Sequence, residues 1–268
     1  MTRPVRLKAT FQEKIWGSTN LEPWFPRSDK KIGEVWFTAE SAIPVLVKFL
    51  FTSDKLSVQV HPAGAQGKTE MWYILRAEPG AQIALGFRTP LSRERVREAA
   101  QSGEIESLLR WFPVKPGETY FTPAGTVHAI GAGIALCEIQ QNSDITYRLY
   151  DYGRPRELHL EQGVAVSDLG SHRGMSQPVR RSTTRQLLAG CDYFETELID
   201  ASSKVEQTAH ANRFQLLVFL QGHGKLGDAS FRPGEVWLIP AESGIHLISP
   251  ESPVRVLAVT GPAEVSKV

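Results

Sequence analysis

A short segment with alternating polar side chains carries the clearest chemical signal in this sequence. Apolar and polar residues alternate through positions 56–62, LSVQVHP, which predicts a half-buried β-strand. The polar residues Ser57, Gln59 and His61 then share one face of that strand. The next predicted strand begins on Glu70. Folded as a hairpin, the two strands direct an amide oxygen, an imidazole and a carboxylate toward one point, which describes a metal site that lacks one ligand.

The missing ligand is expected to be His128. Positions 117–128 follow the pattern G-x5-P-x-G-x2-H, in which the glycines permit tight turns and the proline fixes a bend before the histidine. With Gln59, His61 and Glu70, this histidine completes a set of two neutral nitrogens, one anionic oxygen and one amide oxygen. The set suits zinc with an open position for water or substrate, and it also suits ferrous iron held by two histidines and one carboxylate.

Length and charge restrict the classes of protein to which the chain can belong. Its 268 residues allow one large domain or two small ones. The formal net charge of +1 does not favour nucleic acid or an anionic membrane as a partner. No segment is apolar enough for a signal peptide or a membrane span, and Cys137 and Cys191 are the only cysteines. We therefore predict a cytoplasmic protein in a reducing compartment.

The elements that must position these residues are mainly strands. Runs of β-branched and aromatic residues bounded by Gly, Pro and Ser predict further strands at 34–37, 45–50 and 82–85. A helical insertion at about 90–112 interrupts them. Thr89 is its expected cap, with Pro90 at the first helical position and Gly103 at the stop, and a second short helix follows from Ile105. We expect the insertion to support the strands without taking part in chemistry.

A repeated segment indicates two copies of one structural unit. Positions 116–124, PGETYFTPA, recur as 233–241, PGEVWLIPA, and a histidine follows each copy, His128 or His246. Two copies predict two similar β-barrels. The predicted organisation is a catalytic domain at 1–170, a linker at 171–184 and a C-terminal domain at 185–268.

The second copy is expected to lack the chemistry of the first. Where the first copy has KTE at 68–70, the second is predicted to have NRF at 212–214, and no Q-x-H precedes it. His246 then has neither a carboxylate nor a second patterned ligand beside it. We therefore predict that the C-terminal barrel binds no metal.

Several motifs together resemble one enzyme family. G-x5-P-x-G-x2-H is similar to the second cupin motif without its terminal asparagine, and the duplication resembles a bicupin. The motifs LSVQVHP, GKTEMWYIL, PAGTVHAI and IQQNSDITYRLYDYGR, with KIWGS and GEVWFTAE, resemble type I mannose-6-phosphate isomerases of the short bacterial kind over essentially the whole chain. One departure is a shorter loop from His61 to Glu70, in which Ala63 and Gly64 replace common acidic residues. The resemblance implies a mainly β fold of two cupin-type jelly-roll β-barrels, with the helical insertion in the first.

The resemblance also implies an activity and a cofactor. The activity is zinc-dependent interconversion of mannose 6-phosphate and fructose 6-phosphate through an enediol(ate). One zinc ion per chain is implied, held by Gln59, His61, Glu70 and His128. The implied partner is a small-molecule sugar phosphate, while the oligomeric state, monomer or homodimer, stays open.

By the same resemblance, four residues act on the substrate. Arg148 matches an active-site arginine of the family, Lys48 and Lys68 match active-site lysines, and Ser57 matches a substrate-contacting serine. The implied roles are catalytic for Arg148, Lys68 and Lys48 and substrate-binding for all four. Lys48 also interrupts an apolar strand, where burial would lower its pKa towards that of a useful base.

Alternatives remain open from the residues themselves. Arg148 could stack on the neighbouring tyrosines, and Lys48 could extend to solvent from the end of the barrel. Glu138 and Asp144 could point inward as acid–base partners or could support other residues, so the base is not identified. An iron-dependent cupin oxygenase would not require Gln59 or the phosphate-binding cations. A non-catalytic sugar-phosphate-binding cupin would keep the pocket and could lose the metal ligands.

Overall fold

The protein is built mainly from antiparallel β-strands. The computed structural model describes residues 3–39 and 43–262, and nearly all the regular elements in these ranges are strands, accompanied by three short helices. The strands in this part of the chain form four sheets, in which hydrogen-bonded neighbours run antiparallel. The predicted mainly β class is confirmed.

Two sheets come from the N-terminal part of the chain. The six-stranded sheet has the order β2-β3-β4-β11-β6-β9, with β2 (Lys8–Ser18), β3 (Ile32–Thr38), β4 (Val45–Phe51), β11 (Ile134–Gln141), β6 (Glu70–Ala77) and β9 (Thr119–Thr122). The five-stranded sheet has the order β12-β5-β10-β7-β8, with β12 (Tyr147–Tyr150), β5 (Val58–Val60), β10 (His128–Ile130), β7 (Gln82–Phe87) and β8 (Leu109–Pro113). The two sheets enclose a core that includes Trp72, Ile83 and Leu136.

The other two sheets come from the C-terminal part, with one N-terminal strand added. The seven-stranded sheet has the order β1-β20-β17-β22-β15-β14-β13, with β1 (Val5–Arg6), β20 (Val236–Ile239), β17 (Gln215–Gln221), β22 (Val254–Thr260), β15 (Glu195–Ala201), β14 (Arg185–Gly190) and β13 (Val179–Arg180). The four-stranded sheet has the order β16-β21-β18-β19, with β16 (Val205–Thr208), β21 (Ile245–Pro250), β18 (Gly224–Leu226) and β19 (Ala229–Phe231). Strand β1 pairs with β20 and so ties the start of the chain to the C-terminal half.

Both halves repeat one strand order. The series β9-β6-β11-β4-β3-β2 matches β20-β17-β22-β15-β14-β13, and the series β5-β10-β7-β8 matches β16-β21-β18-β19. The repeated sequence segment enters each half in the same way. Gly117 and Gly234 have φ of 91° and 84° and turn the chain into β9 and β20, a conformation that glycine adopts without strain.

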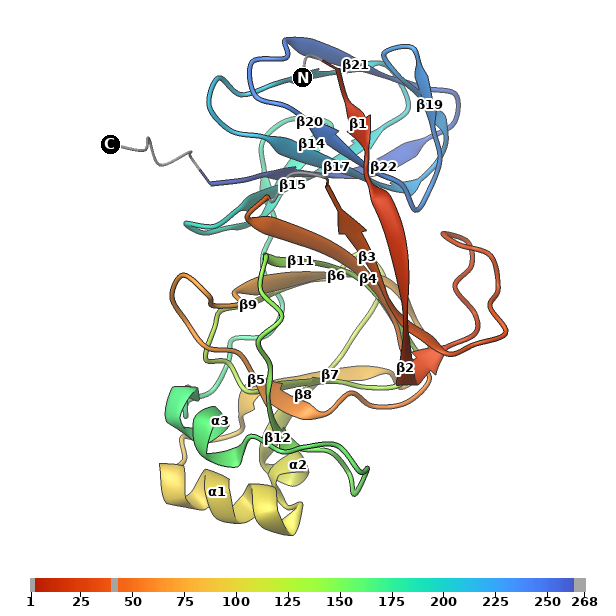
Figure 1. The fold of residues 1–268 in the computed structure, drawn as a ribbon. Helices are drawn as coiled ribbons and strands as arrows, with labels where there is room; N and C mark the ends of the chain where they lie inside the picture. The colour runs from red at the N-terminus through yellow and green to blue at the C-terminus, as the bar shows by residue number, and fades with distance from the viewer. Residues whose placement is uncertain (1–2, 40–42, 263–268) are drawn as a thin grey trace.

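The four sheets lie in layers, one above the other (Figure 1). The six- and seven-stranded sheets pack face to face in the middle, where one apolar cluster joins Phe49 and Tyr73 of the first sheet to Leu216 and Val259 of the second. The five- and four-stranded sheets cover the outer sides, each over a core of its own. Burial of aromatic and branched side chains between facing sheets stabilises this stack.

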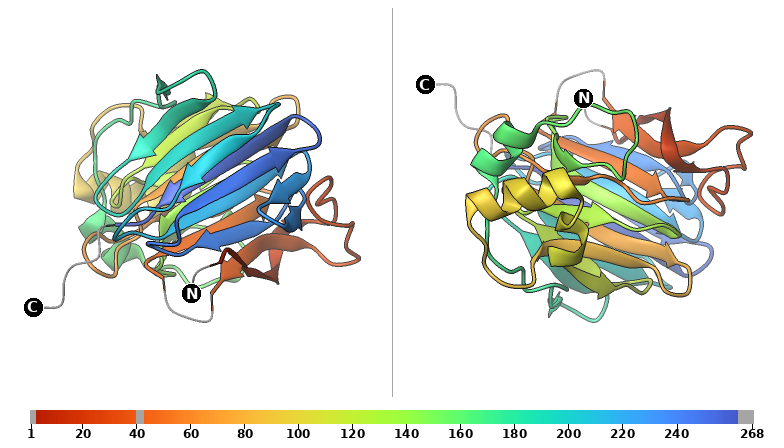
Figure 2. Two further views of the ribbon diagram at one scale, coloured as in Figure 1. Left: turned by 90° about the horizontal axis from the view of Figure 1, so that it is seen from above. Right: turned by 90° about the horizontal axis from the view of Figure 1, so that it is seen from below.

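Three short helices pack against the outer face of the five-stranded sheet (Figure 2). The predicted insertion forms α1 (Arg93–Ser102) and α2 (Ile105–Leu108), and α3 (Leu160–Val166) follows β12. The predicted cap at Thr89 and Pro90 is wrong, because the hydroxyl of Ser92 accepts the hydrogen bond from the Arg95 amide that caps α1. Gly103 ends the helix at φ 83°, as predicted. None of the helices in the described ranges is long and apolar enough to cross a membrane.

The predicted hairpin between the strands that carry Gln59 and Glu70 is wrong. Both strands exist, but β5 lies between β12 and β10 while β6 lies between β11 and β9, so the two belong to facing sheets. The edges of β5 are already occupied, so the chain after Pro62 crosses to the opposite sheet and turns where the Gly67 amide donates to the Gly64 carbonyl. Residues from these two strands therefore approach each other across the interior.

Candidate metal centre and active site

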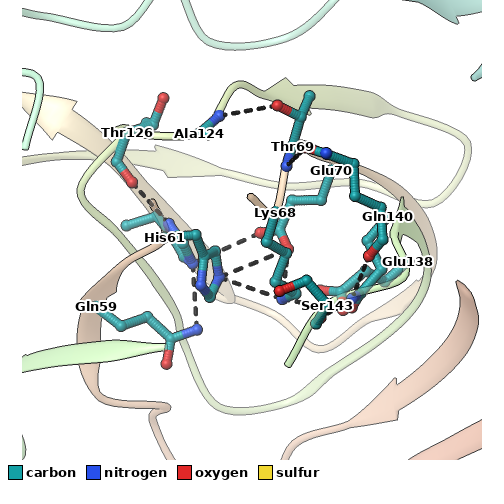
Figure 3. A network of polar contacts seen from close by, with 12 residues as sticks. Gln59, His61, Lys68, Thr69, Glu70, Ala124, Thr126, Glu138, Gln140 and Ser143 are labelled. Carbon is teal, nitrogen blue, oxygen red and sulfur yellow. Dashed lines mark hydrogen bonds and ion pairs between the residues drawn. The ribbon is translucent and has the colours of Figure 1, made fainter. Parts of the chain in front are cut away.

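Three buried residues from the two facing sheets converge inside the N-terminal half. His128 opens β10, His61 follows β5, and Glu70 opens β6. One ligand atom of each residue lies within 4.8 Å of the others. Gln59 joins them because it pairs with His128 across β5 and β10, with its Nε2 3.2 Å from His128 Nε2. Figure 3 shows Gln59, His61 and Glu70 gathered in one polar network.

Hydrogen bonds to the backbone fix both imidazoles. His61 Nδ1 donates to the Ile145 carbonyl and His128 Nδ1 to the Thr126 carbonyl, each at 2.9 Å. A proton on Nδ1 leaves a free lone pair on Nε2, the form that binds a metal. Burial lowers the pKa of His128 to about 3, and burial with the charge of Lys68 lowers the pKa of His61 well below its usual value. Both rings are therefore neutral near neutral pH, as metal ligands must be.

Glu70 lies between the two rings. Its Oε2 is 3.7 Å from His61 Nε2, and its Oε1 is 3.6 Å from His128 Nε2. Oε1 is buried without a hydrogen-bond donor among the described residues, an arrangement that is costly unless a cation reaches the oxygen. A divalent cation bound by these three residues would satisfy it, and Gln59 would add its amide oxygen once the amide is turned over, because its Nε2 faces His128 here and its Oε1 accepts from Ser57 Oγ. The donor set therefore fits zinc or ferrous iron.

A cavity of about 230 Å³ lies beside this cluster. Five basic and three acidic side chains are part of its lining: Lys14, Lys48, Lys68, Arg148 and Arg156, with Glu34, Glu138 and Asp144. A larger groove of about 870 Å³ lies elsewhere, and its lining includes Trp24, Phe25 and Phe37 but none of these groups. The larger groove also contains charged side chains, among them Arg6 and Arg232, but only the smaller cavity includes Gln59 and Lys68 of the buried polar network, so the smaller cavity is the candidate active site.

Lys48 is buried in the wall of this cavity. Its side chain is 2 % exposed, and its Nζ lies 3.8 Å from Glu138 Oε1 and 4.0 Å from Asp144 Oδ1. The ammonium also lies over the Trp36 ring, 4.1 Å from its centre. Burial and the charge of Lys68 lower the pKa of Lys48, while Glu138 opposes the change. The alternative in which Lys48 extends to solvent is wrong, because β4 directs it inward.

Lys68 and Glu138 lie against the cluster of His61, Glu70 and His128, called the metal cluster below. Lys68 Nζ is 2.6 Å from Glu70 Oε2, 3.5 Å from Glu138 Oε1 and 3.2 Å from His61 Nε2. Burial alone would lower the pKa of Lys68, but the charges of Glu138 and Glu70 outweigh it and raise that pKa. Burial and the charge of Glu138 raise the pKa of Glu70. Trp72 Nε1 donates to Glu138 Oε2 at 3.0 Å and keeps this carboxylate inside the barrel.

Arg148 and Ser57 belong to the opposite wall. Arg148 pairs with Gln59 across β12 and β5, and Ser57 Oγ donates to Gln59 Oε1 at 3.0 Å. Arg148 Nη1 donates to the Glu157 carbonyl at 2.6 Å, while its Nε is buried and has no partner in the described ranges. Each residue predicted for the site thus lies either at the cavity or in the metal cluster beside it.

Two further cations at the cavity were not predicted. Lys14 lies on β2 and pairs with Glu34 Oε2 at 3.2 Å. It shares a strand face with Trp16, which also lines the cavity, but nothing in the alternation of β2 marks that face as part of a site. Arg156 lies in the loop after β12, where irregular backbone offers no periodicity from which to infer a direction.

Comparison with known proteins identifies the family, although no family model matches the chain. A mannose-6-phosphate isomerase of Bacillus subtilis is 31 % identical over 305 aligned positions, which cover 93 % of this chain and 93 % of that protein. The chain belongs to the mannose-6-phosphate isomerase family. A mannose-6-phosphate isomerase of Streptococcus mutans is 30 % identical over 298 aligned positions, covering 90 % of this chain and 93 % of that one. The predicted family is confirmed.

Solved structures of mannose-6-phosphate isomerases have a similar fold. The crystal structure of a mannose 6-phosphate isomerase from Bacillus subtilis matches with a TM-score of 0.85 at 28 % identity and covers 96 % of this chain and 99 % of that one. A zinc-bound mannose 6-phosphate isomerase matches with a TM-score of 0.77 at 17 % identity, over 97 % and 99 % of the two chains. At that low identity the second match bears on the fold alone.

Strand register identifies the counterparts of the metal cluster in the C-terminal half of this mannose-6-phosphate isomerase family member. His128 pairs with Gln59 across β10 and β5, and His246 pairs with Gln207 in the same way across β21 and β16. Two positions after the glutamine, the first half has a histidine and the second has Ala209. The second half therefore lacks a ligand atom where the first has His61.

Gln215 is the counterpart of Glu70, because each opens the strand that pairs with the repeated segment. The prediction that Phe214 takes this place is wrong by one residue, since the pairing of β17 with β20 sets the register. Gln207 Nε2 donates to Gln215 Oε1 at 3.0 Å, so neutral amides bond to each other here. The described residues contain no second close cluster of three histidine, cysteine or carboxylate groups.

Replacing His246 with alanine should therefore leave the metal content unchanged. His246 Nε2 and Ser243 Oγ lie 2.8 Å apart, so the variant loses one local hydrogen bond and about 1 kcal/mol of stability. Metal per chain and the thermal midpoint can be measured on the same sample. A folded His246→Ala protein that has lost its metal would show that the C-terminal half, and not the N-terminal half, takes part in metal binding.

Proposed function

We propose that the protein is a zinc-dependent aldose–ketose isomerase that interconverts mannose 6-phosphate and fructose 6-phosphate. One observation carries the proposal: a buried His61, Glu70 and His128 cluster lies beside a cavity with basic walls, in a chain of the mannose-6-phosphate isomerase family. A sugar phosphate requires a Lewis acid at its carbonyl and hydroxyl oxygens and cations at its phosphate. The His61, Glu70 and His128 cluster offers ligands for a metal ion that would act as the Lewis acid, and the cavity walls supply the cations.

In the proposed centre, Gln59, His61, Glu70 and His128 hold one zinc ion per chain. When bound, zinc supplies a Lewis acid that stabilises negative charge on the sugar oxygens during isomerisation. The protein keeps both imidazoles neutral and oriented through their Nδ1 hydrogen bonds. Glu70 contributes the negative charge that offsets part of the charge of the cation.

Isomerisation moves a proton between C1 and C2 of the sugar, so one residue must accept and return it. Lys48 suits this role because it lines the cavity and burial lowers its pKa, which raises the fraction of neutral amine. Lys68 is held against Glu70 and stays protonated, so it suits donation of a hydrogen bond to a substrate oxygen. We assign Ser57 to binding of the sugar hydroxyls and Arg148 to stabilisation of the developing negative charge.

We also infer a finer description of the fold. The chain forms two jelly-roll barrels of cupin type, a catalytic domain at 1–170 and a metal-free domain at 185–268, joined by a linker at 171–184. The matching strand order of the two halves supports two copies of one barrel. Because β1 pairs with β20, the first strand of the catalytic range adds to the sheet of the other domain.

Metal analysis combined with a coupled assay tests the function. We expect one zinc ion per chain, and fructose 6-phosphate formed from mannose 6-phosphate. Chelation should abolish turnover, and added zinc should restore it. Iron-dependent oxygen consumption would favour a cupin oxygenase instead, and a zinc-loaded protein that binds the sugar phosphate without turnover would favour a binding protein.

A further inference from the structure

The indole ring of Trp36 lies against the ammonium group of Lys48. Trp36 on β3 and Lys48 on β4 are direct partners in the antiparallel pairing of these strands. Residues directly opposite each other on neighbouring strands have side chains on the same face of the sheet, so these two side chains meet. The Lys48 Nζ atom lies over the ring, 4.1 Å from its centre. At this distance the face of an indole attracts an ammonium, and more strongly where water is excluded.

In the part of the chain that the structure describes, no carboxylate holds Lys48 at hydrogen-bonding distance. Its nearest carboxylate oxygens belong to Glu138 and Asp144 and lie 3.8 Å and 4.0 Å from Nζ. By contrast, Lys68 Nζ lies only 2.6 Å from Glu70 Oε2. The indole beside Lys48, rather than an ion pair, therefore sets the position of its ammonium group.

A hydrogen bond fixes the plane of the indole. Trp36 Nε1 donates to Glu34 Oε2 at 2.9 Å, and Lys14 Nζ lies 3.2 Å from the same oxygen. Burial alone would raise the pKa of Glu34, but the charges of the two neighbouring lysines and the indole hydrogen bond lower it, so the acceptor is an ionised carboxylate. Glu34 and Trp36 lie two positions apart on one strand and share its face. The ring is therefore oriented before any ligand binds.

Trp36 can act on a ligand only through Lys48. Lys48 and Glu34 line the cavity of about 230 Å³, whereas Trp36 is not part of its lining. An aromatic face attracts a charged amine less strongly than a carboxylate at contact distance does. The indole can therefore place Lys48 without keeping it permanently protonated, as the ion pair with Glu70 does for Lys68.

We propose that Trp36, held by Glu34, is a positioning residue that places Lys48 for transfer of the substrate proton. The role of Lys48 in this proposal rests on the proposed function, but its placement by the indole does not. In the transfer, a C–H bond of the sugar breaks, an N–H bond forms at Lys48 Nζ, and the bonding electron pair stays on the sugar as an enediolate. The new ammonium then lies over the face of the indole, which attracts its charge.

A second copy of the same pair occurs in the chain without a lysine. The sequence GEVW occurs twice, ending at Trp36 and at Trp237. Trp237 Nε1 donates to Glu235 Oε2 at 3.0 Å, the same bond that Trp36 makes to the glutamate two residues before it. None of the cation–aromatic contacts among the described residues involves the Trp237 ring. Trp237 therefore provides a matched control.

The first test compares the kinetics of Trp36→Leu, Trp36→Phe and Trp237→Leu. Trp36→Leu removes the aromatic face and should lower kcat on mannose 6-phosphate about tenfold, while KM changes by less than about twofold. Trp36→Phe keeps an aromatic face under the ammonium and should recover most of that loss. Trp237→Leu loses the same type of hydrogen bond and should change kcat by less than about twofold. Zinc content and circular dichroism on the same samples should match the wild-type protein.

Nuclear magnetic resonance of lysine labelled with carbon-13 at Cε gives a readout that does not need turnover. In the zinc-loaded wild-type protein, the ring current of the indole should shift the Cε protons of Lys48 upfield of those of exposed lysines. Lys48→Met identifies the signal by its loss. The shift should vanish in Trp36→Leu and persist in Trp237→Leu.

The two readouts separate this proposal from the proposed function. If the wild-type protein does not turn over mannose 6-phosphate but the Lys48 signal depends on Trp36, the placement of Lys48 stands and the proposed function fails. An active Trp36→Leu enzyme with unchanged kcat, or equal losses of kcat in Trp36→Leu and Trp237→Leu, would overturn the proposal. An unshifted Lys48 signal in the wild-type protein would also overturn it, even if Trp36→Leu does not fold.

Discussion

Replacing either His61 or His128 with alanine should remove most of the bound zinc and nearly all of the isomerase activity. Each substitution deletes one of two neutral nitrogen donors at a buried point where Glu70 supplies the carboxylate. Loss of a direct ligand should exceed the 10–100-fold loss of metal affinity that is roughly typical for removing a hydrogen-bond partner of a ligand. Zinc per chain, circular dichroism and turnover can be measured on one preparation.

The matched control for these variants is His223→Ala. His223 has a side chain that is 60 % exposed, and it lies in the other half of the molecule. It should keep both its zinc and its activity. If both His61→Ala and His128→Ala retained one zinc ion per chain, the proposed ligand set would be wrong.

Replacing Arg148 with alanine should lower turnover about a hundredfold or more without loss of zinc. The guanidinium is partly buried beside Gln59, where a charge-assisted contact to a reacting oxygen is worth about 3 kcal/mol of transition-state stabilisation. Arg148→Lys keeps the charge but loses the planar pair of donors, so it should restore only part of the rate. The measurements are zinc content and kcat on mannose 6-phosphate for each protein.

These variants separate catalysis from metal binding. Because arginine is not a ligand, a zinc-depleted Arg148→Ala protein would mean that Arg148 supports the metal cluster through Gln59. A fully active Arg148→Ala protein would remove Arg148 from the mechanism. The lysines and Arg156 would then be the cations left for the substrate.

Local patterns in the sequence were sufficient for the strand-rich class and for the residue types of the metal cluster. The alternation around Gln59 correctly placed a strand there, and the stop at Gly103 followed from the need for positive φ. The helix start was predicted at Thr89, but the cap is Ser92. Both hydroxyl residues precede the buried residues of the helix, and only the hydrogen bond from the Arg95 amide to the Ser92 hydroxyl shows which of them caps it. The family was evident because motifs from distant parts of the chain occur together.

The sequence by itself indicated the candidate metal ligands, because residue type and strand parity are local properties, and the candidate substrate residues followed from the resemblance to the family. Only the tertiary structure decided that β5 and β6 lie in facing sheets, so that His61 and Glu70 meet across the interior rather than along a hairpin. It also decided that Gln215, and not Phe214, stands where Glu70 stands, and that Arg156 from the loop after β12 lines the cavity. The physical reason is that sheet pairing, register and loop direction depend on contacts between residues far apart in the chain, which no local pattern records.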